Sequence, residues 1–183
     1  MARRARDELL ALRCQLGEAE AFEELVQEFE RPLLYYAAKL LGDQNLAFDI
    51  LQEAWLRAFH QIRRLSQPAS IRAWLYRMVH GLAIDRLRHD RSRRRVEQET
   101  VEWLNEAVES PAFGPQDTAA IHGALDELEL AHREVLVLHF LEDLSIAEIA
   151  SVLDCPPGTI KSRIHYAKRA LRLVLDRGGY GPE

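Results

Sequence analysis

Apolar residues recur every three or four positions along most of this 183-residue chain. That period places side chains on one face of an α-helix, and no useful stretch alternates with the period of two that marks a strand. The pattern predicts an all-α protein. We expect helices over residues 7–16, 20–41, 43–62 and 71–91, one from residue 119 through 128, another entered near residue 131, and two more between residues 145 and 177.

Some positions make these expectations specific. In the first helix, Leu9, Leu12 and Leu16 stand at helical steps and form its apolar stripe. In the second, Pro32 should kink or divide the helix, because proline lacks an N–H and clashes with the preceding turn. In the third, Phe59 belongs to the apolar stripe.

Residues 144–173 have the pattern of a helix-turn-helix. Ser145 can cap a helix, and Glu148, three residues on, completes a capping box. Helix breakers at residues 154–158 precede a second, basic helix, and a short helix packed on a basic one fits the DNA major groove. The apolar stripes of the two helices are Ile146, Ile149, Ala150 and Leu153, then Ile160, Ile164, Ala167 and Leu171.

Charge is distributed unevenly along the chain. The net charge is −5 in total, but it is +4 over residues 1–95, −6 over residues 96–120 and −3 over residues 121–183. Two basic clusters separated by an acidic stretch suggest two DNA contacts joined by a connector. We therefore expect two small helical domains at residues 1–95 and 121–177, a linker at residues 96–120 and a frayed tail at residues 178–183.

Other features exclude several classes of protein. No apolar run is long enough to cross a membrane and no signal-peptide core follows the basic start, so we expect a cytoplasmic protein. Cys14 and Cys155 lack paired spacing and are interpreted as buried or inert thiols. The seven histidines share no metal-ligand spacing. We expect no metal and no cofactor.

Asp49 and Glu53 lie four residues apart and share a helix face, a spacing that acid–base catalysis could use. Nothing nearby supplies a nucleophile, a cofactor loop or a pocket. The sequence therefore does not predict an enzyme.

Three segments, in this order, resemble the extracytoplasmic-function (ECF) sigma factors of the bacterial sigma-70 family. Residues 49–59, DILQEAWLRAF, resemble the polymerase-binding helix of that family. Residues 71–88, IRAWLYRMVHGLAIDRLR, resemble its promoter-melting and −10 helix. Residues 144–171, which contain PPGTIKSR, resemble its −35 reader.

The resemblance implies a sigma factor that binds core RNA polymerase, directs promoter-specific transcription initiation and opens the −10 region. Its expected partners are the clamp helices of the largest polymerase subunit, the flap of the second subunit, promoter DNA and an anti-sigma factor. The acidic linker would thread the RNA channel of the polymerase. The polymerase-binding residues would be Asp49, Gln52, Glu53, Trp55 and Leu56.

The family also implies how the first domain opens DNA. The loop at residues 61–70 would capture a flipped base of the non-template strand, and the arginine run at residues 86–95 would grip the duplex backbone upstream. The expected contacts with the −10 element and upstream DNA are Arg63, Arg64, Ser66, Gln67, Arg72, Trp74, Tyr76, Arg77, Arg86, Arg88, Arg91, Arg93, Arg94 and Arg95.

In the second domain, the basic helix supplies the expected −35 contacts. Base or near-base contacts are expected from Lys161, Ser162, Arg163 and His165, and phosphate contacts from Lys168, Arg169 and Arg172. Thr159 and the free N–H groups of the helix start could bind a phosphate directly.

Three positions depart from the family pattern. Phe48 either alters partner affinity or extends the core. Gly81 replaces a common asparagine, and Pro157 suggests that the recognition helix begins differently. Trp55 and Trp74 could also be core residues only.

Two other hypotheses fit the same residues. One is a helix-turn-helix regulator with an N-terminal sensor domain, which would bind its operator as a dimer without polymerase. The other is an adaptor or anti-sigma-like protein, which would not support transcription.

Overall fold

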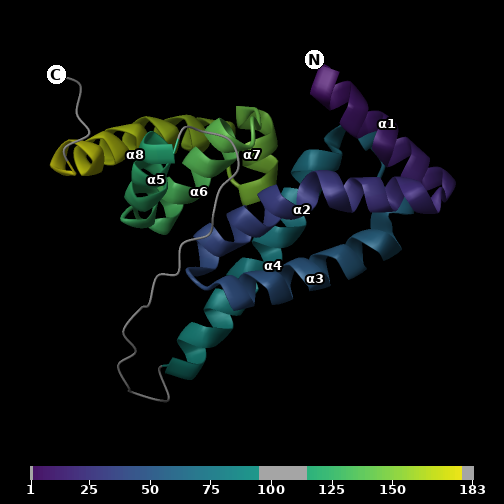
Figure 1. Cartoon of the computed structure of the whole chain (residues 1–183), viewed down its shortest axis with the longest axis horizontal. Helices are drawn as coiled ribbons and strands as arrows, with labels where there is room; N and C mark the ends of the chain where they lie inside the picture. Colours follow the sequence, from purple (N-terminus) through teal and green to yellow (C-terminus); the bar gives the residue numbers. More distant parts are fainter. Residues whose placement is uncertain (1, 95–114, 179–183) are drawn as a thin grey trace. The chain divides into compact units, whose positions relative to one another are not determined.

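The structure is a computed structural model that describes residues 2–94 and 115–178 (Figure 1). Every element within these two ranges is helical, which confirms the all-α prediction. The chain divides into two compact units, Met1–Glu106 and Ala107–Glu183. Each unit has its own core.

Four helices and two short 3-10 turns form the described part of the first unit. α2 packs along α3 and α4, and α1 contacts the two 3-10 turns that connect α3 to α4 (Figure 1). The elements are α1 (Ala2–Leu16), α2 (Ala19–Leu41), α3 (Gln44–Gln61), η1 (Ile62–Arg64), η2 (Pro68–Ser70) and α4 (Ile71–Arg94).

The core of the first unit is built around aromatic side chains of α2 and α4. Tyr36 and Tyr76 are fully buried and meet edge to face, with ring centroids 5.3 Å apart. Phe29 is also fully buried, and each such side chain contributes about 1.5–3 kcal/mol of burial free energy. α2 continues through Pro32, so of the two predicted effects, a kink or a division, the division does not occur. Phe29 and Leu33, on either side of Pro32, are both buried in the same core. This packing keeps the helix continuous although proline cannot donate a backbone hydrogen bond.

α1 is a helix, as expected, but a different face of it is buried. Leu9, Leu12 and Leu16 are 59%, 42% and 82% exposed, so the predicted apolar stripe faces outward. Leu10 and Cys14 are buried instead. Both sets lie at helical steps, and apolar spacing alone does not distinguish them. The orientation of α1 is fixed by polar contacts with other helices.

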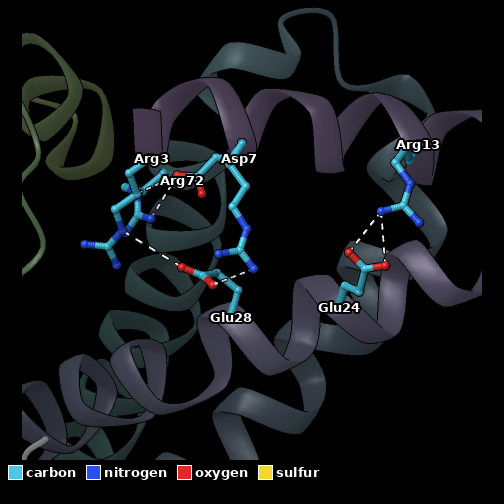
Figure 2. Close-up of polar contacts among 7 residues, drawn as sticks. Arg3, Asp7, Arg13, Glu24, Glu28 and Arg72 are labelled. Carbon is cyan, nitrogen blue, oxygen red and sulfur yellow. Dashed lines mark hydrogen bonds and ion pairs between the residues drawn. The ribbon is translucent and has the colours of Figure 1, made fainter. Parts of the chain in front are cut away.

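The polar contacts of α1 reach both α2 and α4 (Figure 2). The guanidinium of Arg72 donates to Asp7 Oδ2 from Nε at 3.0 Å and from Nη2 at 2.8 Å. Both side chains are buried, so this pair lies out of reach of solvent screening. Arg13 donates to the carboxylate of Glu24 on α2 at 2.9 and 3.1 Å. These contacts and the burial of Leu10 and Cys14 agree on the same inward face of α1.

The contact between Arg13 and Glu24 depends on pH. The hydrogen bond from Arg13 lowers the pKa of the Glu24 carboxyl below its ordinary value. A lowered folded-state pKa adds stability that is present above the unfolded-state value and is lost as the pH falls through the folded-state value. The pair is exposed to solvent, so its contribution is small.

The two cysteines differ in their surroundings. Cys14 is buried in the first unit, and burial raises the pKa of its thiol to about 11. The reactive thiolate is therefore scarce at neutral pH, which agrees with the interpretation of an inert thiol. Cys155 is partly exposed.

The second unit consists of a helical bundle that ends in a long helix. α8 (Pro157–Arg177) packs against α5 (Pro115–Asp126), α6 (Leu130–Leu136) and α7 (Ile146–Leu153). A π-helical turn, η3 (Val137–Leu141), extends α6. α5 begins at Pro115, so the end of the predicted linker at residues 115–120 is helical. The rest of that linker and the tail after residue 178 lie outside the described residues.

Arg133 on α6 holds the turn between α5 and α6. Its guanidinium donates to the carbonyl oxygens of Leu125, Asp126 and Leu128 at 2.9, 2.8 and 2.8 Å. Carbonyls at the end of a helix have no partner within it, and a cation there is also favoured by the helix dipole. One side chain on α6 therefore fixes the end of α5.

Gly81 lies within α4, and a Cβ added there would meet no heavy atom within 4 Å. Replacing glycine by alanine in a helix interior removes conformational freedom from the unfolded chain. We expect Gly81→Ala to raise the free energy of unfolding by about 0.5–1 kcal/mol in urea titrations. Gly42 is the control, because its φ of +67° at the end of α2 disfavours alanine. Gly42→Ala should lower stability, and a gain there would contradict the argument.

The buried pair of Asp7 and Arg72 gives a second prediction. Asp7→Asn would leave the Arg72 guanidinium buried without its counter-charge, and we expect a loss of about 3–5 kcal/mol. The measurement is urea unfolding followed by tryptophan fluorescence, with Glu8→Gln on the exposed face of α1 as the matched control. Equal stability of the two variants would show that the pair does not hold α1 in place.

Candidate nucleic-acid and polymerase interfaces

The helix-turn-helix begins with the predicted capping box. Ser145 Oγ accepts from the backbone N–H of Glu148 at 3.3 Å, and Glu148 Oε2 accepts from the backbone N–H of Ser145 at 2.8 Å. Inside α7, Ile149 and Val152 are buried. The predicted apolar stripe correctly included Ile149. It included Leu153 in place of the neighbouring Val152, which is the buried residue in the structure. Asp154 ends α7 in the left-handed region, with a φ of +50°.

α8 starts at Pro157, with Pro156 as its N-cap. The proline at the departure position thus serves as the first helical residue, where its missing N–H costs nothing. The backbone N–H groups of Thr159 and Ile160 both donate to the Pro156 carbonyl, at 2.9 and 3.2 Å. These two N–H groups are therefore already paired within the turn. A phosphate contact by Thr159 and the remaining N–H of the helix start stays a prediction. The Thr159 side chain is partly exposed.

The two faces of α8 differ sharply in chemistry. Ile160, Ile164 and Ala167 are buried, as predicted, and fix the rotation of the helix. The predicted contact residues that this rotation leaves exposed are Lys161, Ser162, His165, Lys168, Arg169 and Arg172. The sequence from Lys161 to Arg172 contains no acidic residue. The exposed face of α8 is therefore a polar, cationic surface on a rigid helix.

Arg163 differs from its neighbours on α8. Its Nη1 lies 3.4 Å from Oε1 of Glu134 on α6, and the Glu134 side chain is buried. The Arg163 side chain is 36% exposed, so part of the guanidinium reaches solvent while the pair anchors α8 to α6. Arg163 therefore combines a structural role with a position beside the basic face.

Two of the predicted −10 contacts are buried in the first unit. Arg72 is 7% exposed and pairs with Asp7. Its guanidinium also lies over the ring of Phe29, 4.7 Å from the centroid. Tyr76 is fully buried against Tyr36. The prediction that Arg72 and Tyr76 contact DNA is wrong for this structure, because both side chains complete the core.

The other predicted −10 residues lie on the surface where they are described. The loop between α3 and α4 exposes the side chains of Arg63, Arg64, Ser66 and Gln67. Along α4, the exposed residues are Arg77, Arg86 and Arg88, and Trp74 is half-buried. The side chains of Arg91, Arg93 and Arg94, and the whole of Arg95, lie outside the described residues.

Four of the five predicted polymerase-binding residues share one exposed face of α3, and the fifth, Trp55, is half-buried. Asp49, Gln52, Glu53 and Leu56 are exposed, and Leu56 is 65% exposed. This face therefore combines carboxylates with an apolar side chain, which suits a partner that is apolar and basic. Glu53 also forms an ion pair with Arg57 one turn later.

An aromatic cluster that the sequence pattern missed borders this face. The ring of Phe22 on α2 meets Trp55 and Phe59 edge to face, with centroids 6.1 and 5.2 Å away. Phe59 is 61% exposed, so its place in the core stripe was wrong. Phe48 is 44% exposed and does not extend the core. The sequence did contain a signal for this cluster. The apolar stripe of α3 is wider than the face that a helix buries in a core, so some of its apolar residues had to lie outside the core.

No group of three or more His, Cys, Asp or Glu side chains within residues 2–94 and 115–178 is placed to hold a metal ion. Among the helices described, none combines the length and the apolar character that crossing a bilayer requires.

Comparison with known proteins assigns both units. The family described as Sigma-70 region 2 matches residues 25–94. The family described as Sigma-70, region 4 matches residues 118–171. The first match covers α3, α4 and the loop between them, and the second covers the helix-turn-helix.

Similar curated proteins are RNA polymerase sigma factors. The ECF RNA polymerase sigma factor SigL of Mycobacterium tuberculosis is 36% identical over 89% of this chain and 93% of its own length. SigV of Bacillus subtilis, an RNA polymerase sigma factor, is 32% identical over 82% of this chain and 86% of its own length.

Two solved structures share the fold. CnrH, in complex with the cytosolic domain of CnrY, has a TM-score of 0.68 and 24% identity, over 93% of this chain and 97% of its own. The sigma factor RpoE of Bartonella quintana, in complex with the anti-sigma factor NepR, has a TM-score of 0.71 and 23% identity, over 84% and 98%. With the matches of both regions and these levels of identity, the chain belongs to the extracytoplasmic-function sigma factors of the sigma-70 family, which act with RNA polymerase in promoter-specific transcription initiation.

Proposed function

We propose that this chain binds core RNA polymerase through α3, reads the −35 element with α8 and opens the −10 element with the loop at residues 61–70 and α4. The observation that carries the proposal is the exposed cationic face of α8, presented by a capped helix-turn-helix. The match of the first unit to sigma region 2 supports a second DNA contact upstream in the chain.

The exposed face of α8 suits the major groove. An α-helix fits its width, and Lys and Arg can donate to guanine there while other cations bind phosphates. Lys161, Ser162 and His165 stand near the start of α8, the end from which recognition helices usually contact base edges. Lys168, Arg169 and Arg172 follow on later turns and suit phosphate contacts. Arg163 contributes near the bases while it holds α8 against Glu134.

In the first unit, the predicted DNA contacts that remain exposed are assigned to DNA opening. Ser66 and Gln67 offer polar groups on the connecting loop, where a flipped base could be captured. Arg63 and Arg64 precede them, and the half-buried Trp74 can stack on a single-stranded base. The exposed arginines of α4 (Arg77, Arg86 and Arg88) suit backbone contacts with DNA. The burial of Arg72 and Tyr76 makes these two residues supports for that surface.

Polymerase binding is assigned to α3. Carboxylates of Asp49 and Glu53 provide charge complementarity to a basic surface, while the exposed Leu56 and the half-buried Trp55 provide apolar area. On the resemblance, the partner is the pair of clamp helices of the largest subunit, and the flap of the second subunit meets the second unit. No catalytic role is assigned to the chain.

An anti-sigma factor is a further proposed partner, and the cytoplasm, where RNA polymerase acts, is the proposed location. Support for the partner comes from the two solved neighbours of similar fold. One of them is in complex with the anti-sigma factor NepR, and the other with the cytosolic domain of CnrY.

The assignment can be tested by a mobility shift of bacterial promoter fragments with the chain alone, with core polymerase alone and with both. We expect sequence-specific retention only with both components. Specific binding by the isolated chain would instead favour a regulator that acts as a dimer. Absence of any complex with core polymerase would favour an adaptor.

A substitution on α8 separates DNA reading from polymerase binding. We expect Lys161→Ala to weaken holoenzyme binding to a selected promoter by about 1–3 kcal/mol, the usual value of a base contact. Arg177→Ala, which removes an exposed cation from the last turn of the same helix, is the matched control. Core binding should be unchanged in both variants. Equal promoter affinity of the two would remove Lys161 from the interface.

A substitution on α3 should have the opposite effect. Glu53→Lys reverses a charge that faces a basic partner, and we expect core affinity to fall by roughly tenfold. Glu30→Lys is the control, because Glu30 is exposed on α2, outside the proposed interface. Fluorescence anisotropy of labelled chain titrated with core polymerase measures both. A similar loss of core affinity in Glu30→Lys would show that the change in net charge, and not a specific contact of Glu53, weakens binding.

A further inference from the structure

The loop between α3 and α4 is attached to α1 at its beginning. The side-chain amide of Gln15 donates from Nε2 to the carbonyl oxygen of Ile62 at 3.2 Å and to that of Leu65 at 2.6 Å. Ile62 begins η1, and Leu65 follows it directly. Both contacts are part-buried and join residues about fifty positions apart in the sequence. One side chain of α1 therefore fixes the path by which the chain leaves α3.

The end of the same loop is attached to α1 as well. Arg72, the second residue of α4, is paired with Asp7 in the interior. Asp7 and Gln15 stand eight residues apart on α1, which is about 12 Å along a helix axis. The two attachment points thus hold the start and the end of the loop at a separation set by a rigid helix (Figure 2 shows Asp7 and Arg72).

The turn after α1 also fits closely against η1. Gly17 has a φ of +87°, and a Cβ added there would lie 3.0 Å from Nη2 of Arg63. The side chain of Arg63 therefore lies over the end of α1. At the other end, Ser70 donates to the Gln67 carbonyl from its backbone N–H at 2.9 Å and from Oγ at 2.7 Å. Ser66 and Gln67 remain exposed between these two fixed segments.

We infer that α1 is a brace for the base-capturing loop, and that Gln15 is the positioning residue that sets the loop geometry. The inference rests on the proposed role of residues 61–70 in holding a flipped base. A flipped base has lost its stacking energy, and a pocket recovers that energy only if its polar groups are already in place. Gln15 does not contact DNA in this account. It acts by donating to two backbone carbonyls of the loop, and without these hydrogen bonds the loop could shift.

The brace can be tested in the free chain, without DNA or polymerase. Gln15→Met removes the donor and keeps the size and straight shape of the side chain. In amide hydrogen exchange, we expect peptides that cover residues 62–70 to exchange roughly tenfold faster, the effect of losing two part-buried hydrogen bonds. The core of α2 and α4 should keep its protection. The control is Gln27→Met, because Gln27 is exposed on α2. Unchanged exchange in residues 62–70 would overturn the brace.

The effect on base capture is measured with holoenzyme and single-stranded non-template oligonucleotides that carry an abasic site at each −10 position in turn. We expect the wild-type holoenzyme to bind the intact strand more tightly than one of the abasic strands. With Gln15→Met that preference should shrink by roughly tenfold, while affinity for the abasic strand and for core polymerase stays the same.

The possible results are distinct. Faster exchange with an unchanged base preference would overturn Gln15 as a positioning residue. Equal binding of intact and abasic strands by the wild type would contradict the proposed base capture itself, whatever the exchange data show. Loss of affinity for core and for every strand alike would mean that Gln15 supports the whole unit, which also overturns the inference.

Discussion

The buried pair of Asp7 and Arg72 is the contact on which the first unit depends most. Two charges removed from water are costly, and the contact through Asp7 Oδ2 must offset that cost here, because Asp7 Oδ1 and Arg72 Nη1 are buried without a hydrogen bond. Any other placement of α1 against α4 would lose this contact. The observed placement turns Leu10 and Cys14 inward and brings Gln15 to the loop before α4. A structural ion pair thereby determines the position of a surface assigned to DNA opening, although neither of its members reaches that surface.

The second unit uses a different constraint. There the capping box of Ser145 and Glu148 fixes where α7 begins, and the buried residues Ile160 and Ile164 fix the rotation of α8. The capping box is closed within four residues of sequence, and the spacing of the apolar residues along α8 is also a local pattern, although their burial requires the neighbouring helices. The cationic face of α8 is consequently presented on a rigid support. Two side chains link that face to more distant elements: Arg163 through Glu134, and Lys168, whose Nζ lies 4.8 Å from the ring centroid of Phe140.

This difference explains what the sequence could predict. The capping box, the turn and the inward face of α8 follow from short-range spacing, and the structure confirms them. The burial of Arg72 and Tyr76, by contrast, depends on partners 65 and 40 positions away in the sequence, Asp7 and Tyr36, which no local pattern reveals. The same limit applies to α1, where two apolar stripes compete. Long-range pairing of polar groups was the missing information.

The central claim is that the two units work together on a promoter held by polymerase. Run-off transcription from a library of promoter fragments, with the starts of the transcripts sequenced, tests it most directly. We predict discrete start sites that appear only when the chain and core polymerase are combined, each preceded by shared −35 and −10 elements. Random start sites, or no transcripts above those of core polymerase alone, would contradict the account.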